Sequence, residues 1–431
     1  MSTAEREILG RYVHLHEPVA EPGPVAVRPP VLDRKLRLLF LNHNVVRAGG
    51  TYYRAFDAAR HLVRRGHSVT LLSISRHGRL KAEREMVDGV EIVHTPDLFW
   101  GIGRSGWDPW DVLMRMRYVR DREWDVVHAW DCRPAVILPA LAARFGRKDR
   151  TKLVIDWCDW WGRGGTQLER GGSWVRYIYN AVETFFEESF RRFGDATTVI
   201  STALWERAMR LGVPLPDIRF IPQGCDPLVQ NRMTRNEARK SLGLDPNAAV
   251  FITVGVLNTS DAALLFKTVP FVRAKLPSAK FFIIGRNRAR VPKHLAGDAV
   301  EELGFVPDET LAAYLSAADA LVVPLAETLS SRARWPSKVN SALIYNLPVV
   351  LTRVGDLPQL LERAEAAFIS SASPQPFAAA IIEAVTDEHR AARVRDAARC
   401  IATDVLPWTK VIDELEACYF DVLSKPETRH N

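Results

Sequence analysis

The sequence has few cysteines, no long apolar run and only a small excess of charge. Its five cysteines are far apart and show neither a disulfide framework nor metal-ligand spacing, so a reducing, cytoplasmic setting is expected. The apolar stretch 135–143 contains Pro139 and is far shorter than the roughly 20 residues that cross a bilayer. The 58 Lys and Arg against 51 Asp and Glu give a net charge of +7, which suits an anionic ligand but does not require nucleic acid. We expect no nucleic-acid partner.

What is present is typical of a globular protein. Apolar residues make up 47% of the chain and charged residues 25%, and 431 residues are enough for two domains. Residues 1–33 contain five prolines and keep neither a helical nor a strand period, so they are interpreted as an N-terminal tail. The alternative is that Ile8, Leu9, Tyr12 and Leu15 hold this segment on the body of the protein.

From Lys35 onward, short apolar runs alternate with amphipathic stretches, which is typical of a parallel sheet covered by helices. The fold class is therefore predicted as α/β. Helices are expected at 52–65 and at 174–193, the second with Phe185, Phe186, Phe190 and Phe193 on a core-facing side. The expected strands of this part are 36–41, 69–74, 90–93, 126–128, 153–156, 197–200 and 219–221.

The apolar period lapses between Pro222 and Asn247, where an interdomain connection is expected. A second unit then begins, with strands at 250–254, 280–284, 321–323, 349–351 and 367–369 and helices at 262–275 and 337–345. A last helix at 408–423 is expected to pack back on the first domain. The predicted organisation is a tail at 1–33, Rossmann-like domains at 34–222 and 223–407, and a C-terminal helical segment at 408–431.

Ligands of open α/β sheets bind beyond the carboxyl ends of the strands, so the residues that follow each strand are the first candidates for a site. After the first strand, Gly49 and Gly50 form a flexible turn before a helix, which suits a phosphate or is a plain tight turn. After later strands come His128, Trp130 and Asp131, and then Asp159, Trp160 and Trp161. Carboxylates beside indole rings suit a sugar, because Asp accepts hydrogen bonds from hydroxyls and the ring stacks on C–H groups.

Two basic loops follow strands of the second domain. One begins at Arg286, and the other contains Arg332, Arg334 and Lys338. They suit a diphosphate, although a solvated loop is the alternative. The basic residues between Arg144 and Lys152 precede a strand and are interpreted as solvated surface, with a membrane-facing or partner-facing patch as the alternative. The stretch 113–122 is interpreted as a solvated amphipathic helix, with a membrane-facing helix as the alternative.

In order and spacing, these segments resemble the GT-B glycosyltransferases of the retaining family 4 type from about Lys35 to the C-terminus. NHNVVRAGGTYYRAFDAARHLVRRGHSVTLLS looks like the family's first strand, Gly-Gly loop and first helix, and WDVVHAW looks like its fourth strand. IPQGCDP resembles the end of the first domain. LGFVPDETLAAYLSAADALVVPL and YNLPVVLTRVGDLPQLL resemble the donor domain. The resemblance implies two Rossmann-like domains facing across a cleft.

The chain departs from the family at the donor site. Val256 follows Gly255 where an Arg is usual, and Asp261 stands near the usual Lys. The two usual glutamates fall near Ala333 and Ser341. We infer that Arg332, Arg334 and Lys338 replace the lost cations. The expected donor-binding residues are Gly49, Gly50, Gly255, Asn258, Arg286, Arg332, Arg334, Lys338 and Ser341, and the expected acceptor-binding residues are Arg54, His128, Trp130, Asp131, Asp159, Trp160 and Trp161.

The resemblance implies transfer of a sugar from a nucleoside diphosphate sugar to an acceptor hydroxyl, with retention of anomeric configuration and without a metal or other cofactor, in glycan, polysaccharide or glycoconjugate biosynthesis. No catalytic residue is assigned. The missing donor-site residues leave open a catalytically impaired binding or scaffold protein, and a sugar-nucleotide epimerase is a further alternative. A cytoplasmic location is expected, with peripheral association with the inner face of the membrane left open.

Overall fold

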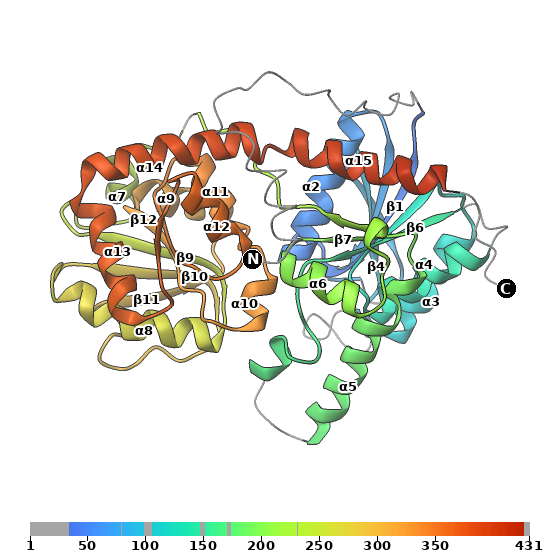
Figure 1. Ribbon diagram of the computed structural model, residues 1–431, viewed down its shortest axis with the longest axis horizontal. Coiled ribbons are helices and arrows are strands. Elements are labelled where there is room, and N and C mark those ends of the chain that lie inside the picture. Colours follow the sequence, from blue (N-terminus) through green and yellow to red (C-terminus); the bar gives the residue numbers. More distant parts are fainter. Residues whose placement is uncertain are drawn as a thin grey trace. The chain divides into compact units, whose positions relative to one another are not determined.

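The computed structural model describes residues 34–78, 80–98, 106–146, 151–169, 174–230 and 232–425. The predicted N-terminal tail therefore lies outside the described residues. The chain divides into two compact units, and in each of them helices cover a sheet (Figure 1). The first unit consists of the residues up to Leu168, Gly172–Pro222 and Trp408–Asn431, and the second is built on Gln223–Pro407.

The described part of the first unit contains an eight-stranded sheet with the order β3-β4-β2-β1-β5-β6-β7-β8. All neighbouring strands are parallel except β3 and β4, which form an antiparallel pair at one edge. The strands are β1 (Arg37–Val45), β2 (Ser68–Ile74), β3 (Glu83–Val87), β4 (Val90–Thr95), β5 (Val126–Trp130), β6 (Lys152–Trp157), β7 (Ala196–Val199) and β8 (Ile218–Phe220).

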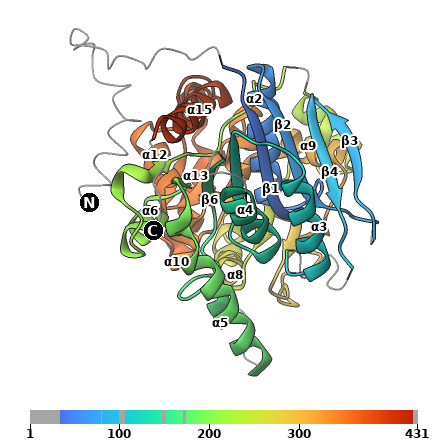
Figure 2. The ribbon, with the colours of Figure 1, turned by 90° about the vertical axis from the view of Figure 1, so that its right-hand side faces the viewer.

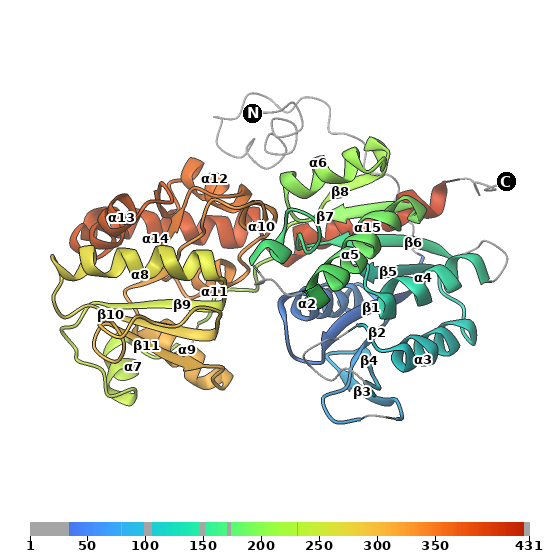
Figure 3. The same cartoon turned by 90° about the horizontal axis from the view of Figure 1, so that it is seen from below.

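Two apolar cores form on the two faces of this sheet. Phe40 of β1 joins a core with the helices α2 and α15, whereas the adjacent Leu41 joins a core with α4, because successive strand residues point to opposite faces. Figure 2 shows α15 beside α2, and Figure 3 shows α3 beside α4. The helices are α2 (Gly50–Arg64), α3 (Pro109–Arg120), α4 (Pro134–Gly146), α5 (Trp174–Ser189), α6 (Thr202–Arg210) and α15 (Trp408–Ser424), with short 3-10 turns η2 (Thr166–Glu169), η3 (Arg191–Phe193) and η4 (Leu215–Asp217).

The second unit has a six-stranded parallel sheet with the order β11-β10-β9-β12-β13-β14. Its core packs Phe251 and Phe281 against Val269 of α8 and Phe377 of α13. The strands are β9 (Val250–Leu257), β10 (Lys280–Asn287), β11 (Val300–Gly304), β12 (Ala320–Val323), β13 (Val349–Thr352) and β14 (Phe368–Ser370). The helices are α7 (Arg235–Ser241), α8 (Thr259–Arg273), α9 (Asp308–Ala317), α10 (Leu329–Ala333), α11 (Lys338–Ile344), α12 (Asp356–Arg363), α13 (Pro374–Thr386) and α14 (Glu388–Cys400), followed by a π-helical turn, η5 (Ile401–Val405).

The α/β prediction is confirmed, and the ends of the expected strands lie within four residues of the observed ones. Two strands were not predicted. The edge strand β3 is largely exposed and has no apolar run, and β11 carries two glutamates, so neither shows the pattern of a buried strand. No helix of the described residues is long and apolar enough to cross a membrane.

Three interpretations of surface and core are wrong. Arg144 and Lys152 are not solvated but buried near Asp195, which pairs with Arg144 at 3.1 Å. Arg115, in the stretch taken as a solvated helix, is fully buried and contacts Asp111 at 2.7 Å. Phe185 of α5 was expected in the core, yet 55% of its surface is exposed. In each case the sequence pattern does not reveal whether a neighbouring element covers the side chain.

Candidate functional site

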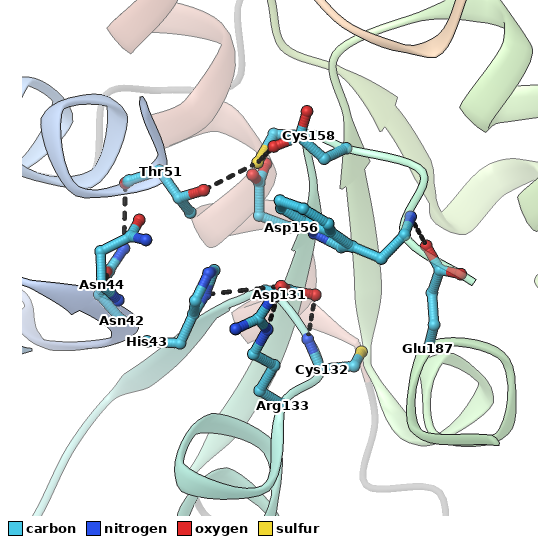
Figure 4. A network of polar contacts seen from close by, with 12 residues as sticks. Asn42, His43, Asn44, Thr51, Asp131, Cys132, Arg133, Asp156, Cys158 and Glu187 are labelled. Carbon is cyan, nitrogen blue, oxygen red and sulfur yellow. Dashed lines mark hydrogen bonds and ion pairs between the residues drawn. The ribbon is translucent and has the colours of Figure 1, made fainter. Parts of the chain in front are cut away.

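The carboxyl ends of the central strands β1 and β5 bring His43 and Asp131 together (Figure 4). Asn42 of β1 pairs with Trp130 of β5. The residues that follow them, His43 and Asp131, therefore lie at the same edge of the sheet. The His43 Nδ1 is 3.5 Å from the Asp131 Oδ2, and both side chains are buried. Asp131 has a φ of 96°, a backbone conformation that non-glycine residues rarely adopt, and its Oδ1 accepts a 2.6 Å hydrogen bond from the Cys132 N–H.

The electrostatics of this pair follow from its burial. Burial, with a smaller effect of Arg133, holds the pKa of His43 well below its usual range. Burial also raises the pKa of Asp131, although Arg133 opposes this shift. Two buried polar atoms of the pair, His43 Nδ1 and Asp131 Oδ2, have no hydrogen-bond partner among the residues that the structure describes. Such a group of unsatisfied atoms can bind a water molecule or a substrate hydroxyl.

Arg133 links this pair to the loop after β6. Its Nε lies 3.9 Å from Asp131 Oδ2, its Nη2 lies 3.6 Å from Glu183 of α5, and its guanidinium lies 5.1 Å from the centre of the Trp161 ring. The structure thus brings Asp131 and Trp161 to one edge of the sheet, as the sequence predicted. It adds His43 and Arg133, which were not among the predicted site residues although each lies close to the end of a predicted strand.

Glu187 of α5 holds the loop that carries Trp161. Its two carboxylate oxygens accept hydrogen bonds from the backbone N–H groups of Trp161 at 2.8 Å and Gly162 at 2.7 Å. It also accepts one from the Trp157 indole at 3.1 Å and lies 3.3 Å from Arg207. Burial raises the pKa of Glu187, and Arg207 is the first of the groups that oppose this shift. No motif in the sequence marks this residue.

Gly49 and Gly50 form a turn before a helix, as predicted. The side chain of Asn44 caps this turn. Gly49 has a φ of 85°, and a Cβ atom there would lie 2.8 Å from the Asn44 amide. Asn44 Oδ1 accepts a 3.1 Å hydrogen bond from the Tyr52 N–H at the start of α2. Gly50, by contrast, is exposed, and a Cβ atom there would have no other atom within 4 Å.

Arg54, His128 and Trp130 were expected to bind the acceptor, and in the structure each of them contacts other parts of the first unit. All three are buried. Arg54 pairs with Asp156 at 3.2 Å and donates a 2.7 Å hydrogen bond to the carbonyl of Ile221. These contacts join α2 to the ends of β6 and β8, and acceptor binding by these side chains stays a prediction.

His128 joins the sheet to the C-terminal helix. Its Nδ1 is 2.7 Å from the hydroxyl of Tyr419, and its ring stacks on Trp130 at 4.2 Å. Burial lowers the pKa of His128 to about 3, so the ring is neutral. The sequence located these side chains next to a strand end. It did not predict the direction in which they point.

The remaining residues predicted to bind the acceptor differ in exposure. Trp160 is largely buried, donates from its indole to the Arg163 carbonyl at 2.7 Å and stacks under Arg207 at 4.0 Å. Asp159 and Trp161 are only half-buried. Among the three residues, Asp159 and Trp161 are therefore the ones that a ligand can reach.

In the second unit, Gly255, Gly285 and Lys338 lie together. Gly285 pairs with Gly255 across β9 and β10, and a Cβ at Gly285 would lie 2.3 Å from the Gly255 carbonyl oxygen. A Cβ at Gly255 would lie 3.7 Å from Cγ of Lys338, so the Lys338 stem runs beside the Gly255 backbone. Arg286 follows at the same edge and is exposed. A cationic side chain beside an open glycine backbone suits a phosphate group.

Arg332 and Arg334 were expected to replace the lost cations, and both are paired with acids. Arg334 forms an ion pair with the buried Asp261, and Arg332 forms one with Glu327 at the surface. Both arginines therefore have an acidic partner, and their replacement of the lost cations stays a prediction. Asp261 also accepts a 2.8 Å hydrogen bond from the Ala326 N–H, so it ties α8 to the loop after β12.

Other candidates surround the Gly255 edge. Asn258 is buried and precedes α8, while Ser341 is half-buried one turn after Lys338 in α11. Phe305, which was not among the predicted site residues, follows β11 directly and has 82% of its surface exposed. An exposed aromatic ring at this edge can stack on a planar base. Among the described residues, no group of three or more His, Cys, Asp and Glu side chains is arranged to hold a metal ion.

Comparisons with known proteins agree with this geometry. Residues 49–224 match the family model of the glycosyl transferase 4-like domain, and residues 248–387 match that of glycosyl transferases group 1. The chain is 28% identical over 198 residues to a protein of Bacillus subtilis (strain 168) described as the teichuronic acid biosynthesis glycosyltransferase TuaC. That alignment covers 46% of this chain and 49% of the relative, so it spans about half the length of each.

Solved structures share the fold over most of the chain. Sucrose-phosphate synthase from Thermosynechococcus elongatus is 16% identical, with a TM-score of 0.69 over 90% of this chain and 100% of that one. Anabaena Alr3699/HepE in complex with UDP-glucose is 15% identical, with a TM-score of 0.61 over 90% and 100% of the two chains. With the two α/β units and the two family models, these similarities show that the chain belongs to the glycosyltransferases of the GT-B fold, with a family 4-like first domain.

Proposed function

We propose that this protein transfers a sugar from a nucleoside diphosphate sugar to a hydroxyl group of a growing polysaccharide or glycoconjugate, with retention of the anomeric configuration. The observation that carries the proposal is the position of Lys338 beside the open Gly255 backbone at the carboxyl edge of the second sheet. The relative named for teichuronic acid biosynthesis and the structural neighbour that binds UDP-glucose support the two substrate classes.

The second unit would bind the donor. Lys338 and the exposed Arg286 offer positive charge for the diphosphate, and Gly255 and Gly285 let the backbone approach it. Phe305 offers a ring for the nucleotide base. Arg334 acts indirectly in this proposal, because its ion pair with Asp261 holds the loop that leads to Lys338.

The first unit would bind the acceptor. The half-buried Trp161 offers an aromatic face for a sugar ring, and Asp159 offers a carboxylate for hydroxyl groups. His43, Asp131 and Arg133 lie at the same edge, and the unsatisfied His43 Nδ1 and Asp131 Oδ2 can hold an acceptor hydroxyl or a water that contacts it. Glu187 fixes the loop on which Trp161 lies.

In the proposed reaction, the bond between the anomeric carbon and the diphosphate oxygen breaks and negative charge develops on that oxygen. The acceptor oxygen bonds to the anomeric carbon from the same face, and its proton passes to the departing diphosphate. Lys338, Arg286 and backbone N–H groups would stabilise the charge, as prearranged donors do in other enzymes. This scheme requires neither a protein nucleophile nor a metal ion.

Donor binding and turnover can be tested separately with a panel of nucleoside diphosphate sugars. A matching donor at about 100 times its Kd stabilises a folded domain by about 2.7 kcal/mol, which raises Tm by several degrees. Nucleotide release that depends on an added acceptor then measures transfer. Lys338→Ala should lose the stabilisation, whereas Lys267→Ala, on the exposed surface of α8, should keep it. If no donor stabilises the protein, the proposed donor site is wrong.

A scaffold protein without catalysis is the second candidate, because Arg334 and Arg332 are both paired with acids rather than open to a donor. The same experiment separates the two candidates. A protein that binds a donor but releases no nucleotide with any acceptor fits the scaffold. An epimerase would instead interconvert the donor sugar without an acceptor.

A further inference from the structure

Helix α5 carries a row of exposed apolar side chains. Trp174, Tyr177, Ile178 and Phe185 expose 75%, 76%, 58% and 55% of their surface, and Val182 exposes 39%. Their spacing of three or four residues places them on one side of the helix. The N-terminal end of α5 extends away from the sheet of the first unit (Figures 1 and 2). We call these five residues the α5 face.

The inward side of the same helix is acidic. Glu183 and Glu187 each expose only 3% of their surface, and they contact Arg133 at 3.6 Å and Arg207 at 3.3 Å. A surface helix usually buries its apolar side and exposes its charged side. In α5, Phe186 packs against the core with α4 and is partly buried, as Phe190 is, but the residues of the α5 face stay exposed. Ion pairs satisfy the two buried carboxylates. The exposed apolar side chains are therefore left for contact with something other than water.

The charges around the α5 face have one sign. In the described parts of 159–193, the exposed charged residues are Arg163, Arg176 and Arg192, and every Asp or Glu is buried or half-buried. Trp and Tyr prefer the boundary between water and lipid, since one end of each ring system is polar. Exposed arginines in the same surface segment favour an anionic lipid surface over a neutral one.

We propose that the α5 face docks the protein on an anionic membrane surface, with Trp174 and Tyr177 inserted at the lipid headgroups and with Arg163, Arg176 and Arg192 adding positive charge from the same segment. The interaction is peripheral, because the helix lies in the interface rather than across the bilayer. The surface lies on α5 and not on the stretch 113–122, where Arg115 is buried with Asp111. This membrane interaction is a property in addition to sugar transfer, and it does not depend on the identity of the donor.

Vesicle binding by the full chain tests the proposal. Co-sedimentation with phosphatidylglycerol and phosphatidylcholine vesicles should be at least about tenfold stronger than with phosphatidylcholine alone at low salt. Trp174→Ser together with Phe185→Ser should weaken binding to the mixed vesicles about tenfold or more. This double variant removes two aromatic rings that the lipid surface would partly bury. Arg176→Gln together with Arg192→Gln should weaken binding to the mixed vesicles and leave phosphatidylcholine binding unchanged.

Leu113→Ser and Met209→Ser are matched controls, because Leu113 on α3 and Met209 on α6 expose 41% and 44% of their surface. Both should bind vesicles as the unmodified protein does. Thermal unfolding by circular dichroism checks the fold, and Tyr177→Ser or Ile178→Ser replaces the double variant if it unfolds early. Stabilisation by a nucleoside diphosphate sugar, measured in parallel, reports the proposed function separately.

Three results would overturn the proposal. The first is equal binding of the α5 variants and the unmodified protein, and the second is no binding of the unmodified protein to either vesicle. The third is a dimer in sedimentation velocity that the α5 variants convert to a monomer without a change in vesicle binding, which would make the α5 face a contact between two copies.

Discussion

His43 and Asp131 lie side by side at the ends of two neighbouring strands, with 3.5 Å between Nδ1 and Oδ2. The residues are 88 positions apart in the sequence, and the parallel pairing of β1 with β5 joins them. Arg133 extends the contact to Trp161. In this arrangement a buried polar pair positions the side chains that we propose to meet the acceptor.

Asp131→Asn should raise the KM for the acceptor about tenfold. The amide keeps the shape of the carboxylate but no longer attracts Arg133, so the position of Arg133 over Trp161 is less defined. The Tm should change by only a few degrees, because the variant also removes the cost of burying a charge. Initial rates at varied acceptor concentration measure the effect, and donor stabilisation should stay unchanged. A fall in donor binding would contradict the assignment.

Glu187→Gln should destabilise the first unit by about 1–3 kcal/mol and raise the KM for the acceptor. The change removes the charge that Arg207 meets at 3.3 Å and one acceptor for the N–H groups of Trp161 and Gly162. Glu188→Gln is the control: this neighbouring residue pairs with Arg207 at 2.7 Å but is partly exposed, so its loss should cost less than about 1 kcal/mol. Urea unfolding compares the two, and equal losses would refute the special role of Glu187.

Lys338, Arg334 and Arg332 should respond differently to replacement by alanine. Lys338→Ala should raise the donor Kd at least about tenfold, because a charge-assisted hydrogen bond to phosphate is lost. Arg332→Ala should change it less than twofold, since this exposed side chain already pairs with Glu327. Arg334→Ala should destabilise the second unit by about 3 kcal/mol, because Asp261 is left buried without its partner.

Titration calorimetry with the donor and thermal unfolding measure these three effects. Donor affinities that fall equally in all three variants would show a general effect of charge rather than a site at Lys338.

The stability of the first unit should fall as the pH is lowered from 7 to 5. The pKa of His128 is about 3 in the folded state and ordinarily about 6.5, so the unfolded chain binds the extra proton in this range. The folded state therefore loses about 2 kcal/mol relative to the unfolded state over these two pH units, and the loss continues down to about pH 3.

His128→Gln removes this contribution, so the difference in unfolding free energy between the unmodified protein and the variant should shrink by about 2 kcal/mol on going from pH 7 to pH 5. Tryptophan fluorescence reports this unfolding selectively, because only Trp335 among the 12 tryptophans lies in Gln223–Pro407. A difference that does not vary with pH would mean that the pKa of His128 is the same in the folded and the unfolded chain.

The sequence alone determined the α/β class, most strands and the residues at their carboxyl ends, because buried parallel strands are short apolar runs that need no partner to be recognised. For the same reason it located Asp131, Trp161, Gly255 and Lys338. It did not predict β3 and β11, whose polar side chains hide the strand pattern.

Only the tertiary structure decided which of these side chains are exposed and which charges are paired. Asp261 and Arg334 are 73 residues apart, and His128 and Tyr419 are 291 apart, so no local pattern reveals either contact. The two faces of α5 show the same dependence, because its acids are buried by ion pairs with Arg133 and Arg207, which come from other elements of the first unit. Burial depends on what the rest of the chain places beside a residue, and that is set by packing and not by the residue's own segment.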